Sequence, residues 1–128
     1  MSGGLGVNSG QNTINSPVVK AMQDIRTHIR EVIIGEAEQA GYRVLRILLF
    51  GSRARGDERP DSDWDFFVVV DADRPFSDRE DVASRICWKL AEQGIYADVF
   101  IQSVKAVDLR ENDTGLLTYY ALKEGVPL

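Results

Sequence analysis

Three aspartates stand in this sequence where packing alone does not explain a charged side chain. Asp63 and Asp65 flank Trp64 at the start of a continuous apolar run, and Asp98 lies inside a later apolar run. Alternate residues of a strand point to the same face, about 6.6 Å apart along the chain, so Asp63 and Asp65 can converge on a hard divalent cation. A turn explains Asp63 well, but an unpaired charge on Asp65 beside this apolar run would cost several kcal/mol.

Asp98 can join this pair if its strand lies next to the strand of Asp65. Its carboxylate would then lie about 5 Å across the sheet, and the buried charges would need a common countercharge. One hypothesis is a Mg²⁺ site, and the other is a structural ion-pair network with nearby arginines. The two strands carry no lysines to match the aspartates, which favours the metal. The arginines available for the network are Arg46, Arg53 and Arg55.

A glycine and a serine, Gly51 and Ser52, directly follow the apolar stretch at residues 43–50. Glycine lets the backbone approach a ligand closely, and the free N–H groups of a following helical turn can bind an anion such as phosphate. Arg53 and Arg55 would add positive charge. An ordinary turn can contain the same pair, and the Walker A pattern GxxxxGK[ST] does not occur. The anion site is therefore a hypothesis that depends on what lies beside the turn.

Hydrophobic periodicity predicts the helices and strands that hold these residues. The expected helices run from residue 17 to a stop at Gly41 and over residues 77–93 and 114–123, with a short stretch at 104–110. The expected strands are residues 43–50, 63–70 and 95–101, and the apolar run of the second predicts burial on both faces. These elements predict an α/β (α+β) fold, in which helices flank a small mixed β-sheet.

Two of the expected helices have an apolar side that can be assigned to particular residues. Packing residues of the helix at 77–93 are expected to be Val82, Ile86, Trp88 and Leu90. The apolar side of the terminal helix is expected to consist of Leu116, Leu117, Tyr120 and Ala121.

The composition is that of an ordinary globular protein. The chain has 128 residues, of which 44% are hydrophobic and 27% charged, which is enough for one domain with its own core. We expect a flexible tail at residues 1–16, which are rich in Gly, Ser and Asn, and a single domain at residues 17–128. With one cysteine the chain cannot form a disulfide framework, and with one cysteine and one histidine it cannot form a Cys/His zinc site. The single histidine also makes a Ser-His-Asp catalytic triad improbable.

Charge and hydropathy restrict the partners that we expect. A net charge of −5 disfavours binding to the backbone of a long nucleic acid, because such binding needs a surplus of Lys and Arg. The sequence has no apolar stretch of about 20 residues and no secretory signal. We therefore expect a cytoplasmic protein that binds neither long nucleic acids nor membranes.

The candidate residues together form a recognisable pattern. The run GSRARG at residues 51–56, the run SDWDF at residues 62–66 and the later Asp98 closely resemble the minimal nucleotidyltransferases of the DNA polymerase β-like superfamily. Their pattern is GSxARG, a spacer, DxDhxV (h, apolar) and a third aspartate on a following strand. The resemblance extends in order and length from about Val18 to the C-terminus. It implies the polymerase β-like nucleotidyltransferase fold.

The resemblance also implies a role for each motif residue. Gly51 and Ser52 would hold the β- and γ-phosphates of a nucleoside triphosphate, with ATP as the expected substrate. Asp63 and Asp65 would bind a pair of Mg²⁺ ions. Asp98 would share the metal that faces the incoming hydroxyl and help to deprotonate it. The reaction would be an in-line attack of the hydroxyl on the α-phosphorus with loss of pyrophosphate, and Arg53 and Arg55 are candidate phosphate or partner contacts.

Many small members of this family resemble antitoxins that pair with a HEPN-domain ribonuclease. The resemblance implies transfer of AMP to a tyrosine of such a toxin, which silences it. A single-domain core leaves one wall of the active-site cleft unbuilt, so we expect a HEPN partner or a second subunit in a homo-oligomer to complete it. Two alternatives stay open, namely an antitoxin that blocks its partner by contact alone, and a transferase acting on a small molecule such as an aminoglycoside.

Overall fold

The computed structural model describes residues 17–110 and 117–128. The predicted flexible tail at residues 1–16 lies outside the described residues, and so does the start of the predicted terminal helix, including Leu116. No helix in the described part of the chain is long and apolar enough to cross a membrane.

The described residues form a four-stranded mixed sheet with the strand order β3-β2-β1-β4. The antiparallel partners of β1 (Val44–Phe50) are β2 (Trp64–Val70) and β4 (Val126–Pro127). β2 pairs in parallel with β3 (Ala97–Ser103), and α4 (Phe76–Ala91) makes the crossover that a parallel pair requires. The predicted fold class, a small mixed sheet flanked by helices, is confirmed.

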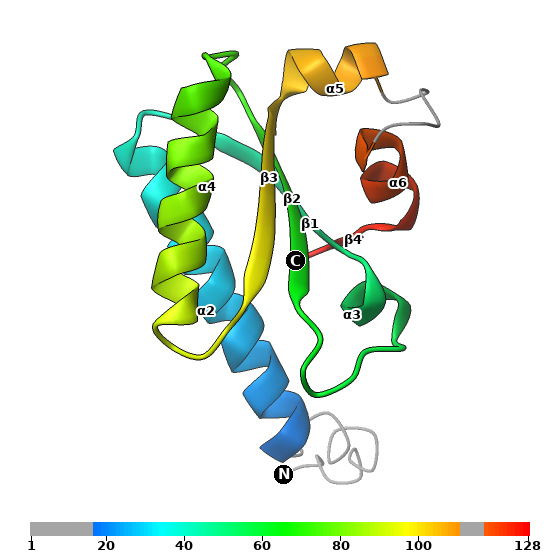
Figure 1. Ribbon diagram of the computed structural model, residues 1–128. Coiled ribbons are helices and arrows are strands. Elements are labelled where there is room, and N and C mark those ends of the chain that lie inside the picture. The colour runs from blue at the N-terminus through cyan, green and yellow to red at the C-terminus, as the bar shows by residue number, and fades with distance from the viewer. Residues whose placement is uncertain (1–16, 111–116) are drawn as a thin grey trace, which may run out of the picture.

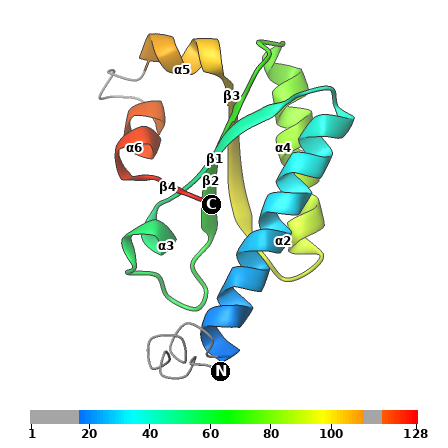
Figure 2. The ribbon, with the colours of Figure 1, turned by 180° about the vertical axis from the view of Figure 1, so that it is seen from behind.

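Helices cover both faces of this sheet (Figures 1 and 2). α2 (Pro17–Gln39) and α4 lie side by side on one face. The other face carries α3 (Ser52–Arg55), α5 (Val104–Arg110) and α6 (Leu117–Glu124). Every residue from Phe66 to Val70 is buried, so the predicted burial of this strand on both faces is confirmed. The chain therefore has a larger core under α2 and α4 and a smaller one under α5 and α6.

Two packing predictions for the helices are corrected by the structure. Val82, Ile86 and Leu90 are buried as expected, but Trp88 is 71% exposed. Two residues correspond to a rotation of about 200° around an α-helix, so Trp88 cannot share the inward side of Ile86 and Leu90. The prediction that Trp88 is a packing residue is wrong.

In the terminal helix α6 the predicted burial of Ala121 is confirmed, but the rest of the buried side differs from the prediction. Its buried residues are Thr118 and Ala121, with Leu122 packed beside them. Leu117 and Tyr120, which were expected inside, are 39% and 50% exposed. The short strand β4, which the sequence does not predict, follows this helix and pairs with β1.

Candidate functional site

The predicted aspartates meet where β2 lies beside β3. Asp65 and Asp98 are direct partners in the parallel register, so their backbones lie about 5 Å apart. Asp63 immediately precedes β2. Asp65 is partly buried, whereas Asp63 and Asp98 are exposed. The expectation that the strands of Asp65 and Asp98 are neighbours is confirmed.

These carboxylates belong to the face of the sheet that is opposite α2 and α4. Side chains alternate along a strand, and Phe67, two residues after Asp65, packs in the smaller core. Phe100, two residues after Asp98, is 38% exposed, and its ring centre lies 6.0 Å from that of Phe50. Sequence reasoning missed this aromatic neighbourhood, although the two-residue spacing from the aspartates was a signal that could have revealed it.

The three carboxylates influence one another electrostatically. Burial raises the pKa of the Asp65 carboxyl above its ordinary value of 3.8, and the charges of Asp98 and Asp63 raise it further. The positive charge of Arg55 opposes this rise. A divalent cation between the carboxylates would relieve both the repulsion and the desolvation of Asp65.

Gly51 brings the backbone against Asp65. Its dihedral angles, φ 76° and ψ −159°, lie in a region that is essentially restricted to glycine. A Cβ atom added to Gly51 would collide with Asp65 Oδ2 and lie 3.2 Å from Asp65 Cγ. The glycine is therefore required both by the turn and by the carboxylate beside it, and it joins the predicted phosphate-binding turn to the predicted metal ligand.

The residues after Gly51 form the single helical turn α3. The amides of Ala54 and Arg55 each donate to the Gly51 carbonyl oxygen at 3.1 Å. The Gly56 amide donates to the Ser52 carbonyl oxygen at 3.0 Å, and Gly56 ends the turn with a φ of 83°. Ser52 is half-buried at the first position of the turn, where the amide groups have no partner within the helix.

Arg53 has a structural role that the sequence does not predict. Its Nε and Nη2 atoms donate to the Ser62 carbonyl oxygen at 3.0 and 2.8 Å. Its guanidinium also stacks on Trp64, 4.4 Å from the ring centre. These contacts tie α3 to the loop that leads into Asp63. Arg53 is thus a positioning residue for that carboxylate, and its contact with a nucleotide stays a prediction.

Arg55 is the other basic residue of the turn. Its Nε lies 3.3 Å from Asp57 Oδ2, and its Nη1 lies 3.8 Å from Glu124 Oε1. Both pairs are exposed and hold the side chain weakly, so Arg55 can turn toward a phosphate. Within the described residues, no ion pair joins an arginine to one of the three aspartates. This arrangement disfavours the alternative in which an arginine network neutralises them.

The donor chemistry of the aspartates fits Mg²⁺, which prefers carboxylate oxygens. In their present rotamers, no three His, Cys, Asp or Glu side chains of residues 17–110 and 117–128 are gathered closely enough to hold a metal ion. Asp63 and Asp98 are exposed and can rotate toward Asp65 without disturbing the core. That these three carboxylates hold a metal ion stays a prediction.

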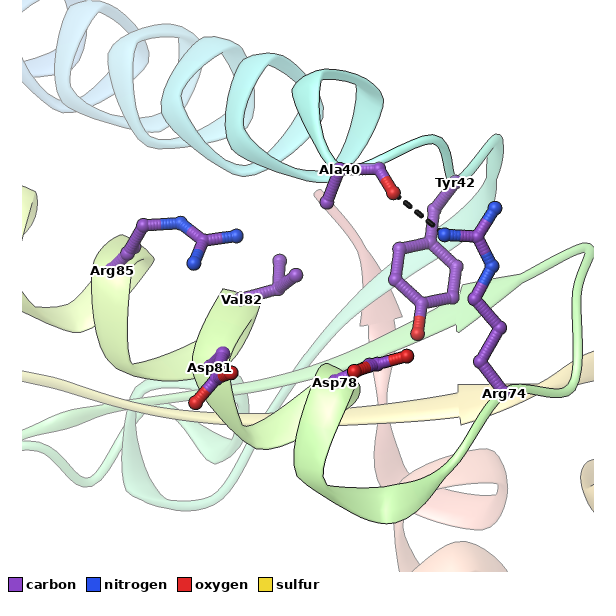
Figure 3. A pocket seen from close by; sticks show the side chains of 7 residues that line it. All are labelled: Ala40, Tyr42, Arg74, Asp78, Asp81, Val82 and Arg85. Carbon is purple, nitrogen blue, oxygen red and sulfur yellow. Dashed lines mark hydrogen bonds between the residues drawn. The ribbon is translucent and has the colours of Figure 1, made fainter.

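A separate hollow of about 260 Å³ lies under the other face of the sheet, between the end of α2 and the start of α4 (Figure 3). The hydroxyl of Tyr42 is buried and has no hydrogen-bond partner within the described residues. Burial raises the pKa of this hydroxyl above its ordinary value of 10.0. Arg74 stacks on the ring and donates to the Ala40 carbonyl oxygen at 2.7 Å. None of the predicted site residues lines this hollow.

A known family model, described as Polymerase beta, Nucleotidyltransferase, matches residues 31–128. The matched segment contains the glycine turn and all three aspartates. The chain belongs to the polymerase β nucleotidyltransferase family. The predicted resemblance is confirmed, and the chain is a nucleotidyltransferase. No curated protein matches it.

This nucleotidyltransferase is similar to several solved structures, and two of them, with TM-scores of 0.50 and 0.51, show the same fold. A minimal nucleotidyltransferase has 25% identity and a TM-score of 0.51, over 83% of this chain and 94% of that one. A toxin–antitoxin complex with AMP-PNP has 19% identity and a TM-score of 0.50, over 76% of this chain and 69% of that one. A tri-AMPylated Shewanella oneidensis HEPN toxin in complex with an MNT antitoxin gives 16% identity and a TM-score of 0.48, over 79% of this chain and 69% of that one.

Proposed function

We propose that this nucleotidyltransferase is a cytoplasmic antitoxin that transfers AMP from ATP to a tyrosine hydroxyl of a HEPN toxin partner. The observation that carries the proposal is the in-register pair of Asp65 and Asp98 beside the strained turn at Gly51. AMP transfer to a toxin is the reaction that the resemblance of the sequence motifs to this family implies. The likeness in fold to a toxin–antitoxin complex with AMP-PNP, an analogue of ATP, is consistent with it.

In this proposal Asp63, Asp65 and Asp98 hold two Mg²⁺ ions. The exposed side chains of Asp63 and Asp98 rotate toward Asp65, whose position is limited by its contact with Gly51. When bound, the ions supply positive charge that stabilises the attacking and leaving oxygens. Because the strands fix the backbones of Asp65 and Asp98, little reorganisation is required after the side chains have closed.

The remaining residues bind the nucleotide and handle the proton. The backbone of Gly51 and the amide and hydroxyl of Ser52 hold the β- and γ-phosphates, with Arg55 as a further cation. The tyrosine oxygen forms a bond to the α-phosphorus while the bond from that phosphorus to the bridging oxygen breaks, so pyrophosphate leaves. The hydroxyl proton passes to a carboxylate oxygen of Asp98. The exposed ring of Phe100, on the same face, is suited to contact an aromatic acceptor.

The test is label transfer from [α-³²P]ATP in the presence of Mg²⁺. The acceptors are a HEPN toxin, the same toxin with its acceptor tyrosine replaced by phenylalanine, and an aminoglycoside. We expect label on the toxin that depends on its tyrosine, and none on either protein from [γ-³²P]ATP. Label on the aminoglycoside alone would instead support the small-molecule alternative.

Asp65→Ala distinguishes neutralisation of the toxin by nucleotidyl transfer from neutralisation by binding alone. We expect this variant to bind the toxin, transfer no label and fail to neutralise it. Full neutralisation by Asp65→Ala would contradict the proposal and favour an antitoxin that acts by contact alone.

A further inference from the structure

Trp88 projects from the outer face of α4, away from the sheet. It is 71% exposed, and Tyr96, just before β3, is 63% exposed. The hollow of about 250 Å³ beside them is lined by Trp88, Ala91, Glu92 and Tyr96. Two large aromatic residues exposed side by side are unusual on a charged surface and are typical of protein interfaces.

A larger hollow of about 440 Å³ also has Trp88 in its lining and lies where Glu36 of α2 meets Ser84, Arg85 and Lys89 of α4. Its floor contains Glu36, which is only 5% exposed. Lys89 Nζ lies 2.7 Å and Arg85 Nε 3.5 Å from the Glu36 carboxylate oxygens. Because the charged ends of Glu36, Arg85 and Lys89 neutralise one another, the hollow is lined by the aliphatic stems of Arg85 and Lys89 and by the indole ring of Trp88.

Arg85 and Trp88 of α4 and Glu92, the C-cap residue that follows Ala91, form a stripe with the i, i+3, i+7 spacing of one helix side. Arg85 lies about 4.5 Å along the helix axis on one side of Trp88, and the Cα of Glu92 about 6 Å on the other side. A two-fold rotation about an axis that runs beside Trp88, perpendicular to α4, therefore brings each Arg85 near the Glu92 of the other copy. The stripe is complementary in charge to a copy of itself.

We propose that this face of α4, comprising Arg85, Trp88, Lys89 and Glu92, binds a second copy of the chain in an antiparallel, two-fold arrangement. Trp88 of each subunit enters the hollow between α2 and α4 of the other. Arg85, whose Nε lies 3.5 Å from a Glu36 oxygen, pairs through its Nη atoms with Glu92 of the partner subunit. The occupant is a second copy because both the projecting side chain and the hollow that receives it belong to the same surface.

This dimer would leave the candidate active site open. α4 covers the sheet face opposite the carboxylates, so the acceptor can approach Asp65 and Asp98 from the other side. A single pair of helices with Tyr96 at its edge makes a small interface, so we expect a dimer that dissociates on dilution.

Sedimentation velocity over a concentration series tests the proposal, with Leu109→Ala as a matched control. Leu109 on α5 is 77% exposed, so its truncation removes an apolar side chain of equal exposure from another surface. We expect the wild type and Leu109→Ala to dimerise equally, and Trp88→Ala to weaken the dimer roughly tenfold or more. A monomeric wild type at millimolar concentration would overturn the proposal, and so would equal association of Trp88→Ala.

A charge exchange gives an independent test that does not depend on Trp88. Glu92→Arg places two positive residues opposite each other and should weaken the dimer, whereas the double variant Arg85→Glu/Glu92→Arg should restore it. The double variant removes the Arg85 contact with Glu36 but does not substitute Lys89, whose Nζ lies 2.7 Å from Glu36 Oε2, so Arg85→Glu alone is the matched control. Failure of the double variant to associate better than Glu92→Arg would contradict the pairing. Capture of a different protein through Trp88 by a monomeric wild type would also overturn the second-copy assignment.

Discussion

Gly51→Ala is the substitution that most sharply tests the geometry of the site. The backbone at Gly51 has φ 76° and ψ −159°, a region that costs a residue with a side chain about 1–3 kcal/mol. The added Cβ would also collide with Asp65 Oδ2 and lie 3.4 Å from Asp65 Cβ. Relief requires the turn or the carboxylate to move, and either movement separates the predicted phosphate site from the predicted metal ligand. We therefore expect loss of nucleotidyl transfer together with loss of stability.

Gly56→Ala is the matched control, because Gly56 also has a positive φ, 83°, but a Cβ there would meet nothing within 4 Å. It should cost about 1–2 kcal/mol of backbone strain and leave the site intact. Gly51→Ala should be less stable than this control by at least about 1 kcal/mol, or roughly 4 °C in Tm. Thermal unfolding and transfer of label from [α-³²P]ATP provide the two measurements. Equal Tm values of Gly51→Ala and Gly56→Ala, together with full activity of Gly51→Ala, would contradict the requirement for glycine beside Asp65.

Three further predictions concern single side chains. The folded-state pKa of Asp65 is raised above 3.8, so the contribution of Asp65 to stability is full below that pH and is lost as the pH rises through the folded pKa. Asp65→Asn should therefore raise the Tm at pH 7 without Mg²⁺. It should also abolish the Mg²⁺-induced rise in Tm that we expect for the wild type. Arg53→Ala should cost about 1–3 kcal/mol in urea unfolding through loss of the Ser62 carbonyl contact, and an unchanged midpoint would contradict that role. Tyr42→Phe should change stability by less than about 1 kcal/mol at pH 7, because the hydroxyl has no partner within the described residues. It should also lessen the loss of stability above pH 10, since the raised pKa of Tyr42 makes ionisation of the hydroxyl unfavourable in the fold.

The strands and the core of the site follow from local sequence signals. A continuous apolar run that includes Phe66 to Val70 is stable only where both faces are covered, and an aspartate at its head requires a polar neighbour. These two constraints predict β2, and they make the pairing of Asp65 with Asp98 the simplest arrangement. The structure has that pairing.

Other features depend on contacts that no local pattern encodes. The hydrogen bonds from Arg53 to the Ser62 carbonyl oxygen join residues nine apart across a loop. Because the acceptor is a backbone atom, the residue type at position 62 does not indicate the contact. The strand β4 has only two residues, and it exists because Leu48 and Leu49 offer it a free edge. Hydrophobicity alone predicts burial of Trp88, but its angle around the helix places it on the exposed side. Angle is the more reliable guide, since Ile86 and Leu90 already define the inward side.

The most direct test of the account is the transfer of label from [α-³²P]ATP by wild type and Asp65→Asn, compared at equal folded fraction. Circular dichroism and the Tm establish the folded fraction of each protein. We expect Mg²⁺-dependent transfer by the wild type, with release of pyrophosphate, and no transfer by Asp65→Asn, although this variant is at least as stable. Transfer at the wild-type rate by folded Asp65→Asn would contradict the assignment of the catalytic carboxylates.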